Sequence, residues 1–300
     1  PLLFHGLCAA SAGVQLNGDL FAVASDEDNL LRFYRLNQPG RPTGSFNLNP
    51  FLFGSKKGAE TDLEAAARVG DRVYWITSHG RNKAGEPDPN RQKFFALEIE
   101  RHGRDATLKP VGRVYTGLLT DLLREPSLTR FDLATAAGRA PKAEDGLNIE
   151  ALTDTPDGSL LIGFRNPIPQ GRALVVPLLN PARVITGARP EFGKPVLLDL
   201  GGLGLRGMGS TPGGYYLIAG PAQGDAASRL YVWRGGEAVP ELVSNVALAG
   251  LNPEGICLHD SDDHTEFLLL SDDGTRNFHG EDCKDLPVSQ RQFRAVKIPR

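Results

Sequence analysis

The chain has 300 residues, of which 40% are hydrophobic and 23% are charged, a composition typical of globular proteins. Its net charge of −3 excludes a strong general attraction to nucleic acid, and no apolar run approaches the roughly 20 residues that span a bilayer. We therefore expect a single domain over residues 1–300, with no nucleic-acid partner and no membrane span.

Five segments repeat one pattern: a short apolar strand, a turn and a stronger apolar strand. In chain order they are 12–26, 65–79, 151–165, 207–220 and 255–272. Their turns, such as Asn-Gly-Asp and Pro-Asp-Gly, have the composition of β-hairpin turns. The 35 Gly and 22 Pro likewise favour many turns and few long helices. Each segment is therefore predicted to form a hairpin.

Further strands follow these hairpins. Third strands are predicted at 30–36, 94–100, 172–178, 229–234 and 293–298, and fourth strands at 111–115 and 195–200. Four-stranded units that recur about every 40–50 residues are typical of β-propellers. The predicted fold is all-β, a single propeller of about five four-stranded blades.

Two features of the repeat need explanation. Glu64 and Glu150, which precede the second and third hairpins, stand 86 residues apart, and the extra length contains 116–138, whose apolar periodicity predicts a helical insertion. A sixth, degenerate blade in this insertion is the alternative. The fifth repeat has no fourth strand after it, and residues 2–6 are predicted to supply that strand and close the ring.

Charged residues recur at equivalent points of the hairpins. Because the inner strand of a blade runs along the channel and the next strand returns, the start of the first and the end of the second lie on one face. The strand starts carry Glu64, Glu150, Arg206 and Glu254, and the strand ends carry Asp26, His79, Arg165 and Asp272. The sequence therefore predicts a charged site on one face of the channel.

Three strand starts carry Asp or Asn two residues before a Glu, as in Asn148-Ile149-Glu150 and Asn252-Pro253-Glu254. In an extended chain, residues i and i+2 point to one face. Carboxylate and amide oxygens suit Ca²⁺ or Mg²⁺. The predicted ligands of a divalent cation are Glu64, Glu150, Glu254, Asp272, Asn148, Asn252 and Asp26.

Three further side chains receive catalytic roles in this hypothesis. His79 would be a general acid or base, and Arg165 and Arg206 would bind an anionic group. The alternative is an internal brace, in which the glutamates lock neighbouring blades together and the two arginines are their counter-charges.

Long connections at 47–61, 80–91, 116–147 and 273–291 are expected on the same face. They would bring basic side chains to the acidic ring, namely Lys56, Lys57, Arg81, Lys83 and Arg91. A basic rim around a metal-bearing centre suits a small anionic ligand such as a phosphate ester.

Three cysteines, Cys8, Cys257 and Cys283, cannot all pair within the chain. One disulfide, between Cys257 and Cys283, would fit an oxidising compartment, and three unpaired thiols fit equally well. The chain begins at Pro1 without Met, which is compatible with removal of a leader or a tag. A periplasmic or secreted location is favoured over a cytoplasmic one.

Several strings, among them SDEDNLLRFYR (25–35), GDRVYWITSHGRN (70–82) and GLNIEALTDTPDGSLLIGFRNP (146–167), resemble the bacterial domain-of-unknown-function family DUF3616. This resemblance covers nearly the whole chain and implies a β-propeller. The recurrent Glu before an apolar strand is more distantly similar to esterase-like phytases and gluconolactonase-type propellers, which implies a divalent metal over the channel. Ser11 and Arg206 depart from a complete ring of Glu.

The leading functional hypothesis is a metal-assisted hydrolase of a small anionic ester, with a phosphate ester favoured. One alternative is a non-catalytic propeller that binds a ligand or a protein and carries a structural ion. The other is a sugar lactonase, which also needs a metal.

Overall fold

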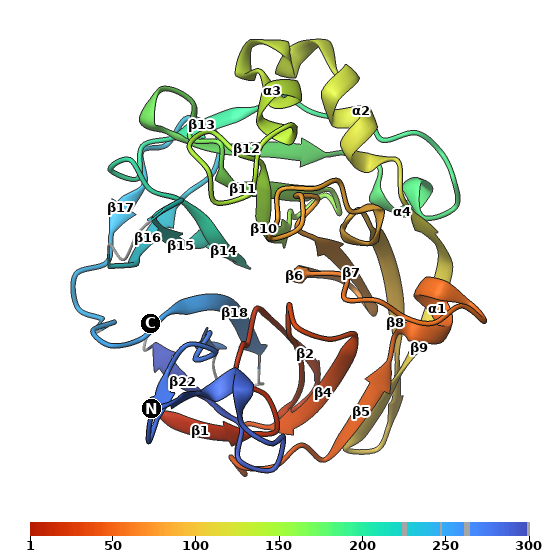
Figure 1. Cartoon of the computed structure of the whole chain (residues 1–300), viewed down its shortest axis with the longest axis vertical. Coiled ribbons are helices and arrows are strands. Elements are labelled where there is room, and N and C mark those ends of the chain that lie inside the picture. Colours follow the sequence, from red (N-terminus) through yellow and green to blue (C-terminus); the bar gives the residue numbers. More distant parts are fainter. Residues whose placement is uncertain (224–226, 247, 261–264, 299–300) are drawn as a thin grey trace.

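A computed structural model describes residues 1–223, 227–246, 248–260 and 265–298. Its strands form five antiparallel four-stranded sheets arranged in a ring, which is a five-bladed β-propeller (Figure 1). The predicted fold is therefore confirmed, and the six-bladed alternative is wrong. The insertion at 116–138 contains the short helices α2 (Leu118–Arg124) and α3 (Leu133–Ala137) with a 3₁₀ turn between them.

Each blade is built from strands consecutive in the chain, except the last. The first two blades are β2 (Ala12–Asn17), β3 (Leu20–Ala24), β4 (Leu30–Arg35) and β5 (Gly44–Asn47), then β6 (Leu63–Val69), β7 (Arg72–Thr77), β8 (Phe94–His102) and β9 (Asp105–Tyr115). The third and fourth are β10 (Asn148–Asp154), β11 (Leu160–Asn166), β12 (Ala173–Leu178) and β13 (Val196–Leu198), then β14 (Gly204–Thr211), β15 (Gly214–Gly220), β16 (Arg229–Trp233) and β17 (Glu241–Leu242).

The fifth blade joins the two ends of the chain. It contains β18 (Pro253–Asp260), β19 (Thr265–Ser271), β22 (Gln292–Ile298) and, as its outer strand, β1 (Leu2–His5). Leu2 pairs with Ala295 and His5 with Gln292, and β1 and β22 lie side by side in Figure 1. The closing role predicted for the N-terminal strand is confirmed.

The remaining elements are short and lie in the connections between strands. They are the helices α1 (Asn49–Phe53) and α4 (Pro181–Val184), three further 3₁₀ turns, and a small ladder of β20 (Asn277–Phe278) with β21 (Glu281–Asp282). No helix in the described ranges has both the length and the apolar character needed to cross a membrane.

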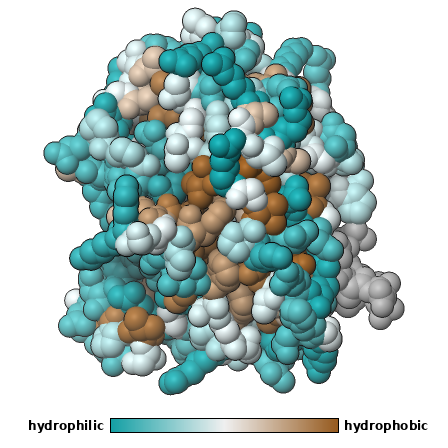
Figure 2. All heavy atoms as spheres, turned by 90° about the vertical axis from the view of Figure 1, so that its right-hand side faces the viewer, coloured by the Kyte–Doolittle hydropathy of each residue, from teal (hydrophilic) through white to brown (hydrophobic). Residues whose placement is uncertain are grey.

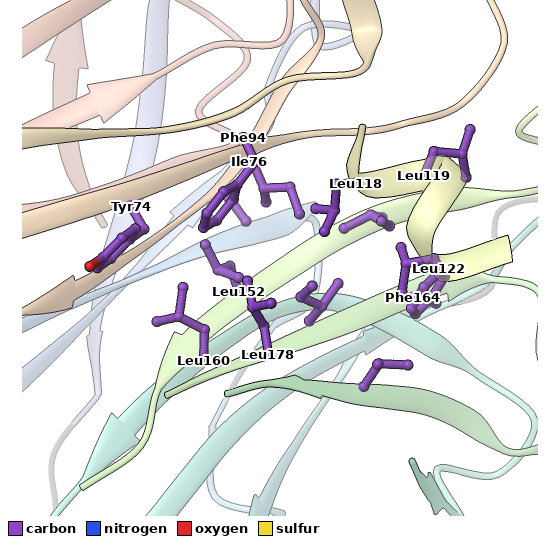
Figure 3. Packing of buried hydrophobic residues seen from close by; sticks show 14 of the residues in the cluster. Tyr74, Ile76, Phe94, Leu118, Leu119, Leu122, Leu152, Leu160, Phe164 and Leu178 are labelled. Atoms are coloured by element: carbon purple, nitrogen blue, oxygen red, sulfur yellow. The ribbon is translucent and has the colours of Figure 1, made fainter. Parts of the chain in front are cut away.

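The innermost strands β2, β6, β10, β14 and β18 contact one another around the ring. Apolar side chains fill the space between neighbouring blades. The largest cluster joins Tyr74 and Ile76 of blade two to Leu152 and Phe164 of blade three, and Leu118 of α2 packs onto it (Figure 3). The helical insertion is therefore part of the core that holds these two blades together.

Figure 2 shows the side that faces right in Figure 1, where an apolar area is surrounded by hydrophilic residues. On this side, the partly buried Phe51 and Phe53 of α1 and Val114 of β9 pack onto the cluster between the first two blades.

The disulfide joins Cys8 to Cys283, with the two Cα atoms 5.9 Å apart. The predicted pairing of Cys257 with Cys283 is wrong, because Cys257 is a free, buried thiol on the inner strand β18. Cys8 follows β1 and Cys283 lies in the connection from β19 to β22, so ring closure is what brings the two together.

Candidate functional site

Four charged residues occupy β-bulges at the start of the inner strands. The register between the first two strands of a blade shifts at these positions, which are Glu64, Glu150, Arg206 and Glu254. At a β-bulge one strand has an extra, unpaired residue, and the side chain of that residue does not follow the regular alternation between the two faces of the sheet. The equivalent residue of blade one, Ser11, precedes β2 and lies outside any bulge.

These residues line a pocket of about 1220 Å³. Nine of the ten residues singled out in the sequence contribute to its wall, namely Asp26, Glu64, Asn148, Glu150, Arg165, Arg206, Asn252, Glu254 and Asp272. Strand starts and strand ends from all five blades therefore meet on one face.

Glu150 is the centre of a buried hydrogen-bond network. Its Oε1 accepts hydrogen bonds from Asn148 Nδ2 at 2.6 Å and from Arg165 Nη1 at 2.8 Å, and its Oε2 lies 3.3 Å from Arg206 Nε. Arg165 also donates from Nε to the carbonyl of Pro221 at 3.0 Å. Two guanidinium groups thus offset the desolvation of this carboxylate.

Arg206 carries the network into the fifth blade. It pairs with the carboxylate of Glu254, and its Nη1 donates to Asn252 Oδ1 at 2.6 Å. Asn252 Nδ2 then donates to Asp272 Oδ2 at 3.2 Å. Blades three, four and five are therefore linked by one chain of ion pairs and hydrogen bonds.

Glu64 of blade two and Asp26 of blade one line another side of the pocket, in a different environment. Glu64 is 9% exposed and makes no hydrogen bond or ion pair with any described residue. Burial, and then the nearby Asp62, Glu150 and Asp26, hold the pKa of Glu64 well above its usual range. Burial, followed by repulsion from Asp272 and Asp62, raises the pKa of Asp26 to about 8.

Two buried acceptors near this side have no partner in the described part of the chain. They are Oδ1 of Asp26 and Oδ1 of Asn148. Asp62 is the Asp that stands two residues before Glu64 in the third such pair, and it is turned toward Arg91, whose Nη1 lies 2.7 Å from its Oδ2. A backbone φ of 58° at Asp62 accompanies this orientation.

His79 does not line the pocket. It is 1% exposed, and its Nδ1 lies 2.8 Å from the carbonyl oxygen of Thr77. Burial lowers its pKa to about 4. Strand β7 ends at Thr77, and the left-handed backbone of His79 (φ 56°) departs from the strand direction on which its predicted place depended.

The predicted basic rim is partly present. Lys83 and Arg91 line the pocket, whereas Lys56 and Lys57 are exposed outside its wall. Arg81 is outside the wall too, since it donates to the carbonyls of Ala137 and Gly85.

Two cations and an apolar wall of the pocket were not predicted from the sequence. Lys142 and Arg229 line the pocket, together with Leu230, Leu242, Val243, Val246, Leu248 and Leu251. The apolar run at 242–251 could have revealed the wall, but no charge pattern points to it.

The residues fit a divalent cation only in part. Glu150 and Glu254 face arginines, and within the described ranges no three His, Cys, Asp or Glu side chains converge as a metal-binding group. The oxygens that lack partners belong to Asp26 and Asn148, with Glu64 beside them in the wall. An ion bound there would have two carboxylates and one amide oxygen, and water would complete its coordination.

Several solved structures are similar to this chain at low sequence identity. Glutaminyl cyclase from Myxococcus xanthus is 10% identical with a TM-score of 0.49, covering 99% of this chain and 93% of its own. The Malassezia sympodialis allergen Mala s 1 is 12% identical with a TM-score of 0.48, covering 100% and 82%. A gluconolactonase from Xanthomonas campestris is 14% identical with a TM-score of 0.41, covering 91% and 73%.

No curated protein matches this chain. A family model does match residues 96–292, well over half of the sequence, and it continues through four of the five blades. The chain therefore belongs to the family described as "Protein of unknown function (DUF3616)".

Proposed function

We propose that the central pocket is the active site of a metal-assisted hydrolase that acts on a small anionic ester, with a phosphate ester as the favoured class. The observation that carries the proposal is the division of the pocket into two unlike parts. One part holds carboxyl and amide oxygens that lack partners, and the wall also carries cationic side chains. Hydrolysis of an anionic ester uses both parts: a metal cation beside the scissile bond, and cationic side chains that bind the anionic group.

Glu64, Asp26 and Asn148 are the residues that would hold the cation. A divalent cation bound there would polarise the ester oxygen and lower the pKa of a bound water. Lys83 and Lys142, which line the same pocket, would bind the anionic part of the substrate.

Glu150, Glu254 and Asn252 have a positioning role in this proposal. They hold Arg165 and Arg206 in fixed places, so that the two guanidinium groups contribute positive charge to the wall. His79 takes no part, because it is buried outside the pocket.

The proposal is tested by metal analysis of the purified protein and of Glu64→Gln, followed by phosphatase, esterase and lactonase assays with the metal found. We expect about one equivalent of metal in the wild type, less in Glu64→Gln, and ester hydrolysis that depends on the metal. Arg81→Gln, outside the pocket wall, is the control and should keep both the metal content and the ester hydrolysis of the wild type. A protein that takes up no metal even after soaking with Ca²⁺, Mg²⁺, Mn²⁺ or Zn²⁺ contradicts the proposal.

A non-catalytic binding propeller is the second candidate. The network from Arg165 through Glu150 and Arg206 to Glu254 favours it, because these side chains already satisfy one another. Ligand binding without turnover in the same assays would support this candidate.

A further inference from the structure

Part of the pocket wall is apolar, although charged and polar side chains line the rest of it. Leu230 belongs to β16 and Leu242 to β17, and the other four apolar residues follow in the segment that leads from the fourth blade to the fifth. We call this set the apolar wall: Leu230, Leu242, Val243, Val246, Leu248 and Leu251.

The apolar wall is anchored, so it cannot simply collapse into the pocket. Leu242 pairs with Tyr231 in the fourth blade, and the backbone N–H of Val243 donates to the carbonyl of Leu230 at 2.8 Å. Val243, Val246 and Leu248 also pack against the core cluster between blades four and five.

Even so, the apolar wall keeps hydrophobic surface in contact with solvent. Leu242 is 53% exposed, and Val246 and Leu248 are only partly buried. Contiguous exposed apolar surface within a pocket typically marks a ligand-binding site. A ligand made only of hydroxyl and phosphate groups would leave this surface uncovered.

We infer that the ligand of this pocket is amphipathic: an ester with an anionic head on the charged side and an alkyl or aryl group against the apolar wall. That the ligand is an ester rests on the proposed function, whereas its apolar group follows from the apolar wall alone. A volume of about 1220 Å³ holds a head group and a short chain together, since typical small-molecule sites occupy roughly 300–1,000 Å³.

The test is calorimetric titration of the full chain with n-alkyl phosphates from ethyl to octyl, and with 1-alkanols of the same lengths. Each methylene that leaves water for an apolar surface strengthens binding about threefold to fourfold. We therefore expect alkyl phosphate affinity to rise by this factor per methylene in the wild type. In the double variant Leu242→Ser, Leu248→Ser, the affinity should increase by less than about twofold per methylene.

Val239→Ser is the matched control, since Val239 is 76% exposed in the connection from β16 to β17 and lies outside the pocket. It should keep the wild-type chain-length dependence. Leu242→Ser alone guards against misfolding, because its side chain is already half exposed, and it should reduce the dependence by itself.

Binding that is independent of chain length in the wild type overturns the inference. So does an unchanged dependence in the double variant, or no binding of either series. The outcome is separable from that of the proposed function. Chain-length-dependent binding without turnover would support the amphipathic ligand and contradict the hydrolase proposal. Turnover without chain-length dependence would support the hydrolase proposal and contradict the amphipathic ligand.

Discussion

Glu150 and Arg206 occupy equivalent bulges in neighbouring blades and form an ion pair across the blade boundary, with Arg206 Nε 3.3 Å from Glu150 Oε2. The arginine also pairs with Glu254 on its other side. A fourth glutamate at this point would have added repulsion to an already acidic ring. The departure of Arg206 from the repeated Glu is therefore what allows three blades to meet at this mouth.

We expect Arg206→Gln to lower the free energy of unfolding by about 3 kcal/mol, because it leaves two buried carboxylates without their shared counter-charge. Urea denaturation measures the change. Arg183→Gln is the control, since the Arg183–Glu191 pair is 68% and 56% exposed and is worth about 0.5 kcal/mol or less. Equal losses in the two variants would contradict the bracing role of Arg206.

His79 should make the protein sensitive to mild acid. Its pKa is lowered to about 4 in the folded chain, against about 6.5 in an unfolded one. The neutral ring therefore stabilises the fold fully above pH 6.5, and that stability is lost as the pH falls toward 4. The loss by pH 5 is about 2 kcal/mol.

His79→Asn should flatten this pH dependence, since Asn tolerates a φ of 56° and does not ionise in this range. Thermal melts at pH 7 and pH 5 measure the effect, and His102→Asn on the exposed end of β8 is the comparison. An acid response of the same size in wild type and His79→Asn would show that another group is responsible.

The disulfide should be detectable by thiol counting. Denatured but unreduced protein is expected to show one reactive thiol, that of Cys257, and the native protein none, because Cys257 is buried. Removing the bond with Cys8→Ser and Cys283→Ser should cost about 2–5 kcal/mol. Three reactive thiols in the denatured, unreduced protein would exclude the Cys8–Cys283 bond.

Phe4 should be a critical residue of the closing strand. Its ring is fully buried and packs against those of Phe21, Tyr34 and Phe293. Phe4→Ala is expected to cost about 3–5 kcal/mol, and Leu3→Ala, at a 38% exposed position of the same strand, less than 1 kcal/mol. Chemical denaturation compares the two. A smaller loss for Phe4→Ala than for Leu3→Ala would mean that β1 contributes little to closure.

The fold could be predicted because its information is local. Hairpin turns such as Pro156-Asp157-Gly158 recur between short apolar strands in every blade, and the spacing of these hairpins predicts a ring of blades. The bulges at Glu64 and Glu150 could not be predicted, since a register shift exists only relative to a partner strand.

The sequence predicts which residues lie at the site, but not which of them form ion pairs with one another. Topology alone places Glu150, Arg165 and Arg206 at one mouth, but which acid meets which base depends on side-chain geometry. Cys8 was missed for a related reason: its partner becomes a neighbour only after the ring closes. The apolar wall could not be predicted in the same way, because the recurrent charges of the hairpins do not extend to residues 242–251.

The pairing of Leu2 with Ala295 has a consequence for the order in which the chain assembles. During synthesis β1, which precedes the other strands of the propeller, must wait for β22 before its blade can be completed, while the four blades between them need only local contacts. Until then, the apolar face of β1 and the edge of the first blade have no permanent neighbour. Folding of this propeller thus ends with a contact between its most N-terminal and most C-terminal strands, and a ribosome-bound chain that stops before β22 carries an open ring.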